Sequence, residues 1–376
     1  MTTASPGRRE RGTTMAKRKV GAAPTVYDVA DAAAVSIATV SRAVRNPESV
    51  TPATRERVEQ AIHELGYVPS APARALADRR TGAYGLLLPG FDDLEDAAAP
   101  APSDGSVRIT DDRGNRSPIG GAPLYYDEVL RGAEVEAWRH GAALLVAVGR
   151  GQGHDIAGRV DGLAVFARTM TDDAIARVAG RTPVVLLADE QAARGIDSVS
   201  VDNARGMRAL VEHVVGELGI RDLAYLAGPK DSPDDAVRRT GLGQALAAHK
   251  VDSRSVRVRH GDFGRARAAQ VAAELIAERA PRALVCANDQ SALGALDAIR
   301  AAGLRVPDDI VVTGFDGIEA GAYATPPITT VRQPMRALGG AAIRALEARI
   351  ADPTAAPQHL TLPVEVLLRE SCPPAL

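Results

Sequence analysis

Residues 36–42 place small and hydroxylated side chains beside an arginine, a combination that suits contact with DNA base pairs. The segment reads S-I-A-T-V-S-R, and Ser36 has the side chain of a helix N-cap. Helical spacing from that cap turns Val40 and Val44 inward. It leaves solvent-facing positions at Ser36, Ile37, Ala38, Ser41 and Arg42. We predict that this helix lies in the major groove, where the apolar pair Ile37 and Ala38 contacts thymine methyl groups.

The segment before Ser36 has the pattern of a second short helix that would position the first. Val26, Val29 and Ala30 fall at i, i+3 and i+4, the apolar stripe of a helix. Thr25 precedes them with Asp28 three residues later, in an arrangement like a capping box. Two short helices joined by a tight turn form a helix-turn-helix. An ordinary pair of core helices has the same periodicity, so the wider pattern must decide between the two interpretations.

The distribution of charge favours a partner that carries phosphates, although the formal net charge is −2. Residues 1–24 carry six basic side chains against one acidic side chain, whereas residues 25–80 are neutral. We interpret residues 1–24 as a basic flexible tail that attracts phosphates without sequence preference; a plain disordered tail is the alternative. Within the two predicted DNA-binding helices, the candidates for phosphate contacts are Thr25, Ser36, Thr39 and Asn46.

A second group of polar side chains follows a buried strand near residue 286. Asn288 and Asp289 come directly after the apolar run 283–286 and open a helix. A carboxylate in such a turn can accept charge-assisted hydrogen bonds from two adjacent hydroxyls of a ligand. We therefore predict that Asp289 binds a hydroxyl-rich ligand; its alternative role is a helix cap.

The spacing over residues 25–69 resembles the DNA-binding headpiece of the LacI/GalR family of bacterial repressors. The pattern V-x-x-V-A-x-x-A-x-V-S-x-x-T-V-S-R is followed by Pro47, a helix over 52–65 and the run G-Y-V-P at 66–69. One departure is Ala34, because the family usually has glycine in this turn. If the position needs a positive φ, alanine costs on the order of 1 kcal/mol. The resemblance implies a helix-turn-helix domain over residues 25–68.

The next stretch, residues 69–81, is predicted to be a hinge helix or linker. Ser70 can cap it and Pro72 falls in its first turn, but the segment is too short to hold a helix alone in water. The pattern P-x-x-x-A-R-x-L resembles the family's hinge. The resemblance implies that Leu76, paired with its copy across a dimer axis, wedges into the minor groove. A linker leucine packed on the next domain is the alternative.

From residue 82 onward, helices alternate with short apolar strands, which is typical of parallel sheets covered on both faces. Strands are predicted at 84–88, 142–148, 160–166, 183–187, 223–227 and 283–286. The helices between and after them are predicted at 126–141, 172–180, 203–218, 234–249, 266–279 and 290–302. The predicted fold class is α/β. It consists of the all-α headpiece and hinge followed by a bilobed, periplasmic-binding-protein-like domain of two doubly wound parallel sheets over 82–376.

The lobe boundaries follow from the resemblance, which implies that the last stretch crosses back between lobes. The N-lobe is predicted over about 82–190 and 308–335, and the C-lobe over about 191–307 and 336–376. Two places do not fit a regular repeat. Residues 91–123 read as a disordered insertion rich in Pro, Gly and Asp, and residues 149–159 leave no room for the helix expected there. The first lobe is therefore predicted to be trimmed or differently wound.

The resemblance also implies effector-binding residues, namely Arg238, Phe263, Asp289 and Asp316. Arg238 begins an R-x-x-G match, and its guanidinium can bind two oxygens; an ordinary surface arginine is the alternative. Phe263 falls where some sugar-responsive members stack an aromatic ring on a sugar, or it belongs to the core. Asp316, in G-F-D-G, closes a local turn or faces the crevice, with the turn favoured. Ala188 departs from the family's aspartate, and Asp189, one residue later, is not expected to point inward.

Several classes of protein are excluded by what the sequence lacks. It has no H-E-x-x-H, P-loop or G-x-S-x-G motif, so we predict no catalytic residues, no metal site and no cofactor. Cys286 and Cys372 have no C-x-x-C partner and fit free thiols in a reducing cytosol. No apolar run reaches the roughly 18 residues of a membrane span, and no signal peptide is recognised.

The resulting prediction is a transcription regulator and not an enzyme. It would be a cytoplasmic repressor, a homodimer or dimer of dimers, that binds double-stranded operator DNA and is modulated by a small-molecule effector between the lobes. The resemblance favours a sugar as effector, with a nucleobase as the runner-up. The alternative function is a sugar- or nucleobase-binding protein or an enzyme on a doubly wound fold, without a role in DNA binding.

Overall fold

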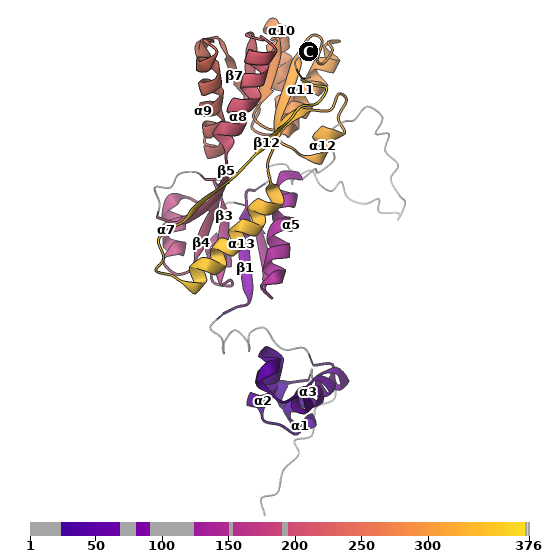
Figure 1. The fold of residues 1–376 in the computed structure, drawn as a ribbon, viewed down its shortest axis with the longest axis vertical. Helices are drawn as coiled ribbons and strands as arrows, with labels where there is room; N and C mark the ends of the chain where they lie inside the picture. Colours follow the sequence, from indigo (N-terminus) through magenta and orange to yellow (C-terminus); the bar gives the residue numbers. More distant parts are fainter. Residues whose placement is uncertain are drawn as a thin grey trace, which may run out of the picture. The chain divides into compact units, whose positions relative to one another are not determined.

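The computed structural model describes residues 24–67, 80–90, 124–149, 153–189, 195–372 and 374. The chain divides into two units, residues 1–79 and residues 80–376, which are treated separately below. Figure 1 shows the ribbon of both units. The predicted tail, the hinge with Leu76 and the insertion 91–123 lie almost entirely outside the described residues, so these predictions stay predictions.

The first unit contains three helices, α1 (Val26–Ala32), α2 (Ile37–Arg45) and α3 (Pro52–Leu65), with a 3₁₀ turn at Pro47–Ser49. Each helix begins where a hydroxyl side chain can cap it. The Asp28 carboxylate accepts from the Thr25 backbone N–H (2.7 Å) and hydroxyl (2.8 Å). Ser36 and Thr51 accept from the backbone N–H three residues ahead, and Gly66 ends α3 in the left-handed conformation. These helices confirm the predicted helix-turn-helix and the helix at 52–65.

The turn between α1 and α2 contains Ala34, which has φ 51°. The left-handed conformation is therefore required here, as expected from the glycine that the family usually carries. The turn is held on both sides by apolar packing, because Val29, Ala33, Val40 and Val58 are buried in one small core. This core fixes the angle between α1 and α2 and leaves the opposite face of α2 uncovered.

The second unit contains two six-stranded sheets (Figure 1). The first sheet is parallel, in the order β11-β5-β4-β3-β1-β2. Its strands are β1 (Ala83–Leu88), β2 (Ala143–Val148), β3 (Gly162–Phe166), β4 (Val184–Leu187), β5 (Asp197–Val201) and β11 (His359–Leu362). The helices of this lobe are α5 (Leu124–Arg139), α6 (Gly153–Ala157), α7 (Asp172–Ala179) and α13 (Met335–Ala351).

The second sheet has the order β12-β10-β9-β8-β6-β7 and is parallel except for β12. Its strands are β6 (Leu223–Ala227), β7 (Arg257–His260), β8 (Ala283–Cys286), β9 (Val311–Asp316), β10 (Thr329–Arg332) and β12 (Glu365–Leu367). Its helices are α8 (Asn203–Glu212, continued by a π-helical turn at His213–Glu217), α9 (Pro233–Ala248), α10 (Arg265–Arg279), α11 (Asp289–Ala301) and α12 (Glu319–Ala322). A 3₁₀ turn covers Ser253–Ser255.

The predicted lobe boundaries are wrong in their second halves. Residues 311–332 form β9 and β10 of the second sheet, not part of the N-lobe, because β9 pairs with β8 and β10 pairs with β9. Conversely, β5 pairs with β4, and α13 packs along α5 and over β3–β5, so both belong to the first lobe. The first lobe thus comprises described residues of 80–201 and 335–362, and the second comprises 203–332 and 365–372.

Two further expectations about the first lobe need correction. Residues 149–159 do accommodate a helix, because the five-residue α6 joins β2 to β3 with Ile156 and Val160 buried beneath the sheet. The sheet is complete and regularly wound, not trimmed. No individual strand was predicted after residue 302, where β9 to β12 lie. Among the earlier strands, two escaped prediction: β5 is rich in buried serines, and β7 is a half-exposed edge strand that alternates arginine with other residues. Neither has the apolar run by which the other strands were recognised.

None of the helices in the described residues is long and apolar enough to span a membrane.

Candidate functional site

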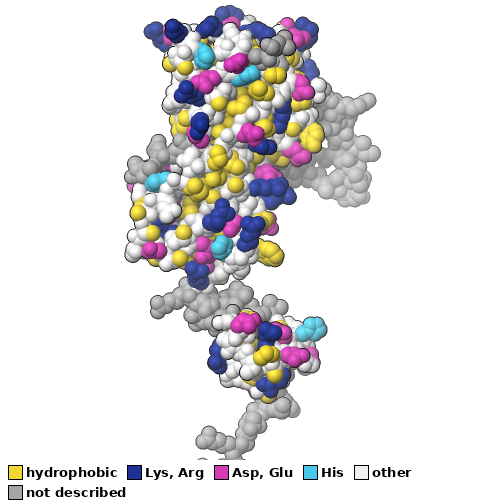
Figure 2. Space-filling view, viewed as in Figure 1, with side chains coloured by type: hydrophobic (Ala, Val, Ile, Leu, Met, Phe, Trp, Pro, Cys, Tyr) yellow, Lys and Arg dark blue, Asp and Glu magenta, His cyan; other side chains and the backbone are white. Residues whose placement is uncertain are grey.

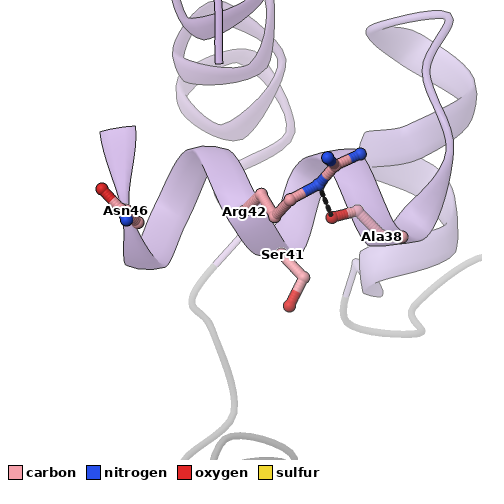
Figure 3. Close-up of a pocket in the computed structure, with 4 residues that line it drawn as sticks. All are labelled: Ala38, Ser41, Arg42 and Asn46. Carbon is pink, nitrogen blue, oxygen red and sulfur yellow. Dashed lines mark hydrogen bonds between the residues drawn. The ribbon is translucent and has the colours of Figure 1, made fainter. Parts of the chain in front are cut away.

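The outer face of α2 presents the residues predicted to read DNA. Ser36, Ile37, Ala38 and Arg42 are exposed, with Ile37 at 39%, while Thr39 and Ser41 are half-buried. A shallow hollow on this face is lined by Ala38, Ser41, Arg42 and Asn46 (Figure 3). Among the described side chains of this face, Ser36, Ala38 and Ser41 are small, and Arg42 is long and flexible. The face can therefore approach base edges closely.

Arg42 is held loosely within its own helix. Its Nε donates to the Ala38 carbonyl at 3.3 Å (Figure 3), and its Nη2 donates to the Thr39 hydroxyl at 3.5 Å. Both distances lie beyond the usual range, so the guanidinium can exchange them for a stronger partner. The predicted phosphate contacts Thr25, Ser36, Thr39 and Asn46 all lie at helix ends or on this face, where Ser36 and Thr39 share a hydroxyl contact at 2.9 Å.

A second candidate site, called the crevice below after its predicted role, consists of residues around Arg238 and Asp316 at the carboxyl ends of the strands of the two lobes. Among described residues, unusual backbone conformations gather there. Positive φ values occur after β3, after β4, after β7 and at the end of β9, at Arg168, Ala188, Asp262, Phe263 and Asp316. Left-handed backbone at non-glycine residues costs of order 1–3 kcal/mol each and clusters at functional sites. Ligands of open α/β sheets bind at the same strand ends.

Arg238, on α9, is the centre of this crevice and not a surface arginine. It is 3% exposed, and it donates to the Asn203 side-chain oxygen (2.8 Å) and the Ala287 carbonyl (2.7 Å). The Phe315 ring centroid lies 3.9 Å from its Cζ atom, close enough for a cation–π contact. A planar guanidinium fixed in this way keeps a defined direction toward any oxygen-rich ligand.

Asp316 lies beside Arg238, as the crevice interpretation required. Its Oδ1 is 3.8 Å from Arg238 Nη1 and accepts from Gln333 Nε2 at 2.7 Å. Burial raises the pKa of Asp316 well above its usual value, although Arg238 opposes the shift. Its φ of 119° shows that the backbone is held in a rare conformation that directs this carboxyl. Asp316 thus faces Arg238, and its carboxyl is held by Gln333 from another element; the N–H groups of the adjacent turn, at Gly317 and Ile318, donate to Asp289 instead.

Asp289 is not placed to bind a ligand in the way the sequence predicted. It is fully buried, and its carboxylate accepts from the Gly317 and Ile318 N–H groups (both 2.8 Å) and from the Thr330 hydroxyl (2.6 Å). Nor does it cap α11, because Asn288 performs that role by accepting from Ser291 N–H. Burial raises the pKa of Asp289 to about 6. Asp289 therefore ties α11 to the loop after β9 and to β10.

Aromatic rings line the crevice from both lobes. Phe263, in the left-handed conformation at φ 64°, is half-buried, and its ring lies 5.8 Å from the Arg238 Cζ atom. In the first lobe, Tyr125 and Tyr126 begin α5 and pack edge-to-face on Phe166, with ring centroids 6.3 and 5.1 Å away. The charges of Asp234 and Asp316 both raise the pKa of Tyr126, after the larger effect of its burial. The tyrosines of the first lobe therefore lie near acids of the second.

Asp189 is buried, contrary to the expectation that it would not point inward. Ala188 takes a left-handed conformation at φ 57°, which turns the following residue, and Asp189 is 2% exposed. Burial raises the pKa of Asp234 across the crevice, and the charge of Asp189 adds to that shift. The one-residue offset from the family pattern is thus compensated by the backbone turn.

Several crevice residues had no signal in the sequence. Asn203 holds Arg238 and also donates to Asp234 at 2.8 Å, and Gln333 holds Asp316. Each belongs to an element distant in sequence from its partner, so no local spacing could reveal the contact. The nearest available signal was the acidic pair Asp234 and Asp235 in the first turn of a helix that begins after a glycine-proline loop. That pattern is common at ordinary helix starts.

Among the described residues, no cluster of His, Cys, Asp and Glu is arranged to hold a metal ion.

Comparison with known proteins shows which protein families this chain matches. Residues 25–70 match the family described as bacterial regulatory proteins, lacI family, and residues 211–372 match the periplasmic binding protein-like domain. The transcriptional regulator CelR of Thermobifida fusca is 33% identical over 365 residues, covering 93% of this chain and 98% of that protein. The lactose operon repressor of Escherichia coli K12 is 33% identical over 349 residues, covering 92% and 90%.

Two solved structures extend the likeness to three dimensions. The lac repressor dimer bound to operator and the anti-inducer ONPF has a TM-score of 0.75 at 29% identity and covers 93% of this chain. A complex of CelR with cellobiose has a TM-score of 0.63 at 30% identity with the same coverage. Each structure is itself covered over 99% of its length. The relatives are transcriptional regulators, which favours that interpretation over an enzyme or a solute-binding protein. With a reading helix in front of a two-lobed sensor and relatives matched along nearly their whole length, this chain belongs to the LacI family of bacterial regulatory proteins.

Proposed function

We propose that this protein is a cytoplasmic repressor whose grip on operator DNA is released by a neutral, polyhydroxylated effector bound around Arg238. The observation that carries the proposal is the presence of both sites in one chain. One is an exposed face on α2 whose described side chains are small, apolar, hydroxylated or basic, and the other is a crevice in which Arg238, Asp316 and Asn203 form a connected network.

The DNA-binding role is supported by the availability of Arg42 and the small residues around it. A dimer presents two such helices, so its site is a pseudo-palindrome with half-sites one helical turn or a multiple apart. Selection of bound duplexes from a random pool, followed by fluorescence anisotropy on the best sequence, tests this role. Sequence-selective, saturable binding with a strong salt dependence supports it. Equal affinity for scrambled duplexes would remove it.

The chemical class of the effector is supported by the charges in the crevice. Among the described residues of the crevice, the acids Asp189, Asp234 and Asp316 lie near the buried guanidinium of Arg238. The guanidinium of Arg168, which also lies near, is already paired with Asp231. An added phosphate or carboxylate would enter beside these acids and lose its hydration without matched compensation. Hydroxyl groups, in contrast, can donate to carboxylates and accept from the guanidinium. The aromatic walls suit the faces of sugar rings, so a sugar is favoured and a nucleobase is the runner-up.

The effector can be found by thermal-shift screening. Cellobiose, lactose, simple hexoses and purine bases would be tested beside a sugar phosphate and a nucleotide as anionic controls. A ligand at 100 times its Kd adds roughly 2.7 kcal/mol to stability. Stabilisation by a neutral sugar and not by its phosphate is the expected result. Tighter binding of the phosphate would overturn the charge argument.

The homodimer is supported by apolar side chains left uncovered on the first lobe. Val135 and Trp138 of α5 are 43% and 80% exposed, and Leu145 and Val146 of the edge strand β2 are 36% and 38% exposed. Figure 2 shows hydrophobic side chains gathered in a band on the face of the two-lobed unit that it displays. Trp138→Asp should yield monomers in sedimentation experiments, whereas Arg177→Asp on the exposed side of α7 should not. Unchanged dimers in Trp138→Asp would place the interface elsewhere.

A further inference from the structure

The two lobes are joined by an ion pair that lies outside the network around Arg238. Arg168 follows β3 in the first lobe, and Asp231 lies between β6 and α9 in the second. Arg168 Nη2 is 2.8 Å from Asp231 Oδ1, with side chains 29% and 62% exposed. The contact therefore spans the two lobes at the edge of solvent. The chain passes between the lobes only after β5, after β10 and after β11, so Arg168 is not constrained to meet Asp231 by a nearby connection.

The backbone of Arg168 is shaped for this contact. Its φ is 71°, a conformation that L side chains other than Asn and Asp rarely adopt and that costs roughly 1–2 kcal/mol. The turn is fastened by Thr169, whose N–H (3.2 Å) and hydroxyl (2.6 Å) both donate to the Phe166 carbonyl. Arg168 Nε is buried without a hydrogen-bond partner among the described residues. The contact with Asp231 is thus the polar interaction that the geometry supplies to this guanidinium.

The ion pair also lies at the wall of the crevice. Burial raises the pKa of Tyr126, with Asp234 and Asp316 adding to the rise, and the positive charge of Arg168 opposes it. Arg168 is therefore close to a ring that packs 5.1 Å from Phe166. Across the same gap, Asp189 and Asp234 repel one another, because the charge of Asp189 raises the pKa of Asp234 after the larger effect of burial. When the lobes approach one another, the attractive pair Arg168–Asp231 and the repulsive pair Asp189–Asp234 are both brought closer.

We propose that Arg168 and Asp231 form a strap that holds the two lobes in the closed arrangement before any effector is bound. The strap sets the fraction of closed protein, and the effector adds to it by placing hydroxyl groups between Asp189 and Asp234, which weakens their repulsion. The role of the strap in regulation rests on the proposed function, because only a protein that senses an effector needs its closed fraction to be set. The strap itself can be tested without that assumption, because the closed fraction can be measured without effector or DNA.

The test is a distance measurement on the full-length protein without ligand. Spin labels on cysteines introduced at Arg177 of α7 and Arg239 of α9, both exposed, report the separation of the lobes by double electron–electron resonance. Labelled protein is diluted with unlabelled protein so that each dimer carries one labelled chain. The native Cys286 and Cys372 are buried and resist labelling. Arg168→Gln, Asp231→Asn and the exchange Arg168→Asp with Asp231→Arg are compared with the parent.

Each single substitution should lower the ratio of short to long distances by roughly twofold to fivefold, the range of a partly exposed ion pair. The exchanged pair should restore the ratio. Arg208→Gln is the matched control: it removes a pair of the same 2.8 Å length that lies within α8, and it should leave the distances unchanged. Distances in Asp231→Asn that match the parent would overturn the strap, and so would failure of the exchanged pair to recover. Asp231 is largely exposed, so this variant folds whether or not the strap exists.

Measurements of effector binding then test the strap and the effector site independently. With cellobiose or whichever sugar stabilises the parent, Asp231→Asn should bind more weakly through faster dissociation. If the strap is confirmed and no sugar binds, the effector assignment fails while the strap stands.

Discussion

Both recognition sites of this protein contain an arginine, but the two arginines are held in opposite ways. Arg42 on α2 is exposed and makes two long hydrogen bonds to its own helix. Arg238 is 3% exposed and is fixed by Asn203, by the Ala287 carbonyl and by the Phe315 ring, each from a different element. A DNA-reading side chain must adapt to a partner that arrives as a rigid duplex. A crevice that encloses a small molecule must be organised before the ligand enters, because ordering it afterwards would weaken binding.

The groups that surround the two arginines differ in a similar way. Around Arg42 the chain provides hydroxyls and small apolar groups, and the opposing charge is expected from DNA. Around Arg238 the chain provides its own opposing charges, Asp234 and Asp316. Removing Arg238 should therefore damage the protein itself, and removing Arg42 should damage only a complex. The following experiments test this contrast, beginning with the largest expected effect.

Arg238→Ala should destabilise the two-lobed unit by about 3–5 kcal/mol, because it leaves buried carboxylates without their counter-charge. Urea unfolding followed by circular dichroism measures the loss. It should shrink as the pH is lowered, since Asp234 and Asp316 have raised pKa values and lose their charge on protonation. Arg239→Ala, at the exposed neighbouring position, is the control and should be nearly neutral. Equal stability of the two variants would mean that Arg238 is not the counter-charge.

Arg42→Ala should lower operator affinity by about 1–3 kcal/mol, or roughly 5- to 150-fold, while thermal stability and effector response stay unchanged. Fluorescence anisotropy with the selected operator measures the affinity. Arg57→Ala, on the exposed side of α3, serves as the comparison and should lose little sequence selectivity. If Arg42→Ala binds operator as the parent does, the face of α2 is not the reader.

Asp289 gives the stability of the two-lobed unit a dependence on pH. Burial raises its pKa to about 6, above the value of about 4 expected in the unfolded chain. The folded state therefore binds its proton more tightly, and stability falls as the pH rises from about 4 through about 6. In Asp289→Asn this slope should flatten, because the amide does not titrate. The Thr330 hydroxyl can reverse and accept from the new amide N–H, so the contact is kept. Melting temperatures across pH 4–8 measure the change, and a slope identical to that of the parent would contradict the assignment.

Ala34→Gly should produce the smallest change, a stabilisation of the headpiece by up to about 1 kcal/mol, because glycine adopts φ 51° without strain. Hydrogen exchange of the α1 and α2 amides in the full-length protein reports it. Ala32→Gly, at the exposed last residue of α1, should have the opposite sign, since glycine is a weaker helix former than alanine. Faster exchange in both variants would show that the turn tolerates alanine without cost.

The headpiece could be predicted from sequence nearly residue by residue because its determinants are local. Caps at Thr25, Ser36 and Thr51 lie within three residues of the groups they bind, and the apolar stripes recur at helical spacing. The strands of the two sheets were recognised where they are uniformly apolar. The strands β5 and β7 were not recognised because serine or arginine interrupts their apolar residues, and a continuous apolar run was the feature that identified the other strands.

The residues of the crevice could be predicted from the sequence only in part. The sequence indicated Arg238 and Asp316, but it assigned Asp289 to the ligand although three donors of its own lobe surround that carboxylate. It dismissed Asp189, because the left-handed turn at Ala188 that reorients it leaves no compositional trace. The lobe boundaries failed for a related reason: strand pairing between β8 and β9 joins segments that the chain order alone leaves unassigned.

Sequence by itself determined the reader, the alternation of helices and buried strands, and the family, because each depends on residues close together in the chain. Tertiary structure alone decided which strands share a sheet, which acids meet Arg238, and that Arg168 reaches Asp231. Those contacts join residues tens to more than a hundred positions apart, and their energies depend on burial and on distance between charges. Neither quantity exists until the two sheets have formed and approached one another.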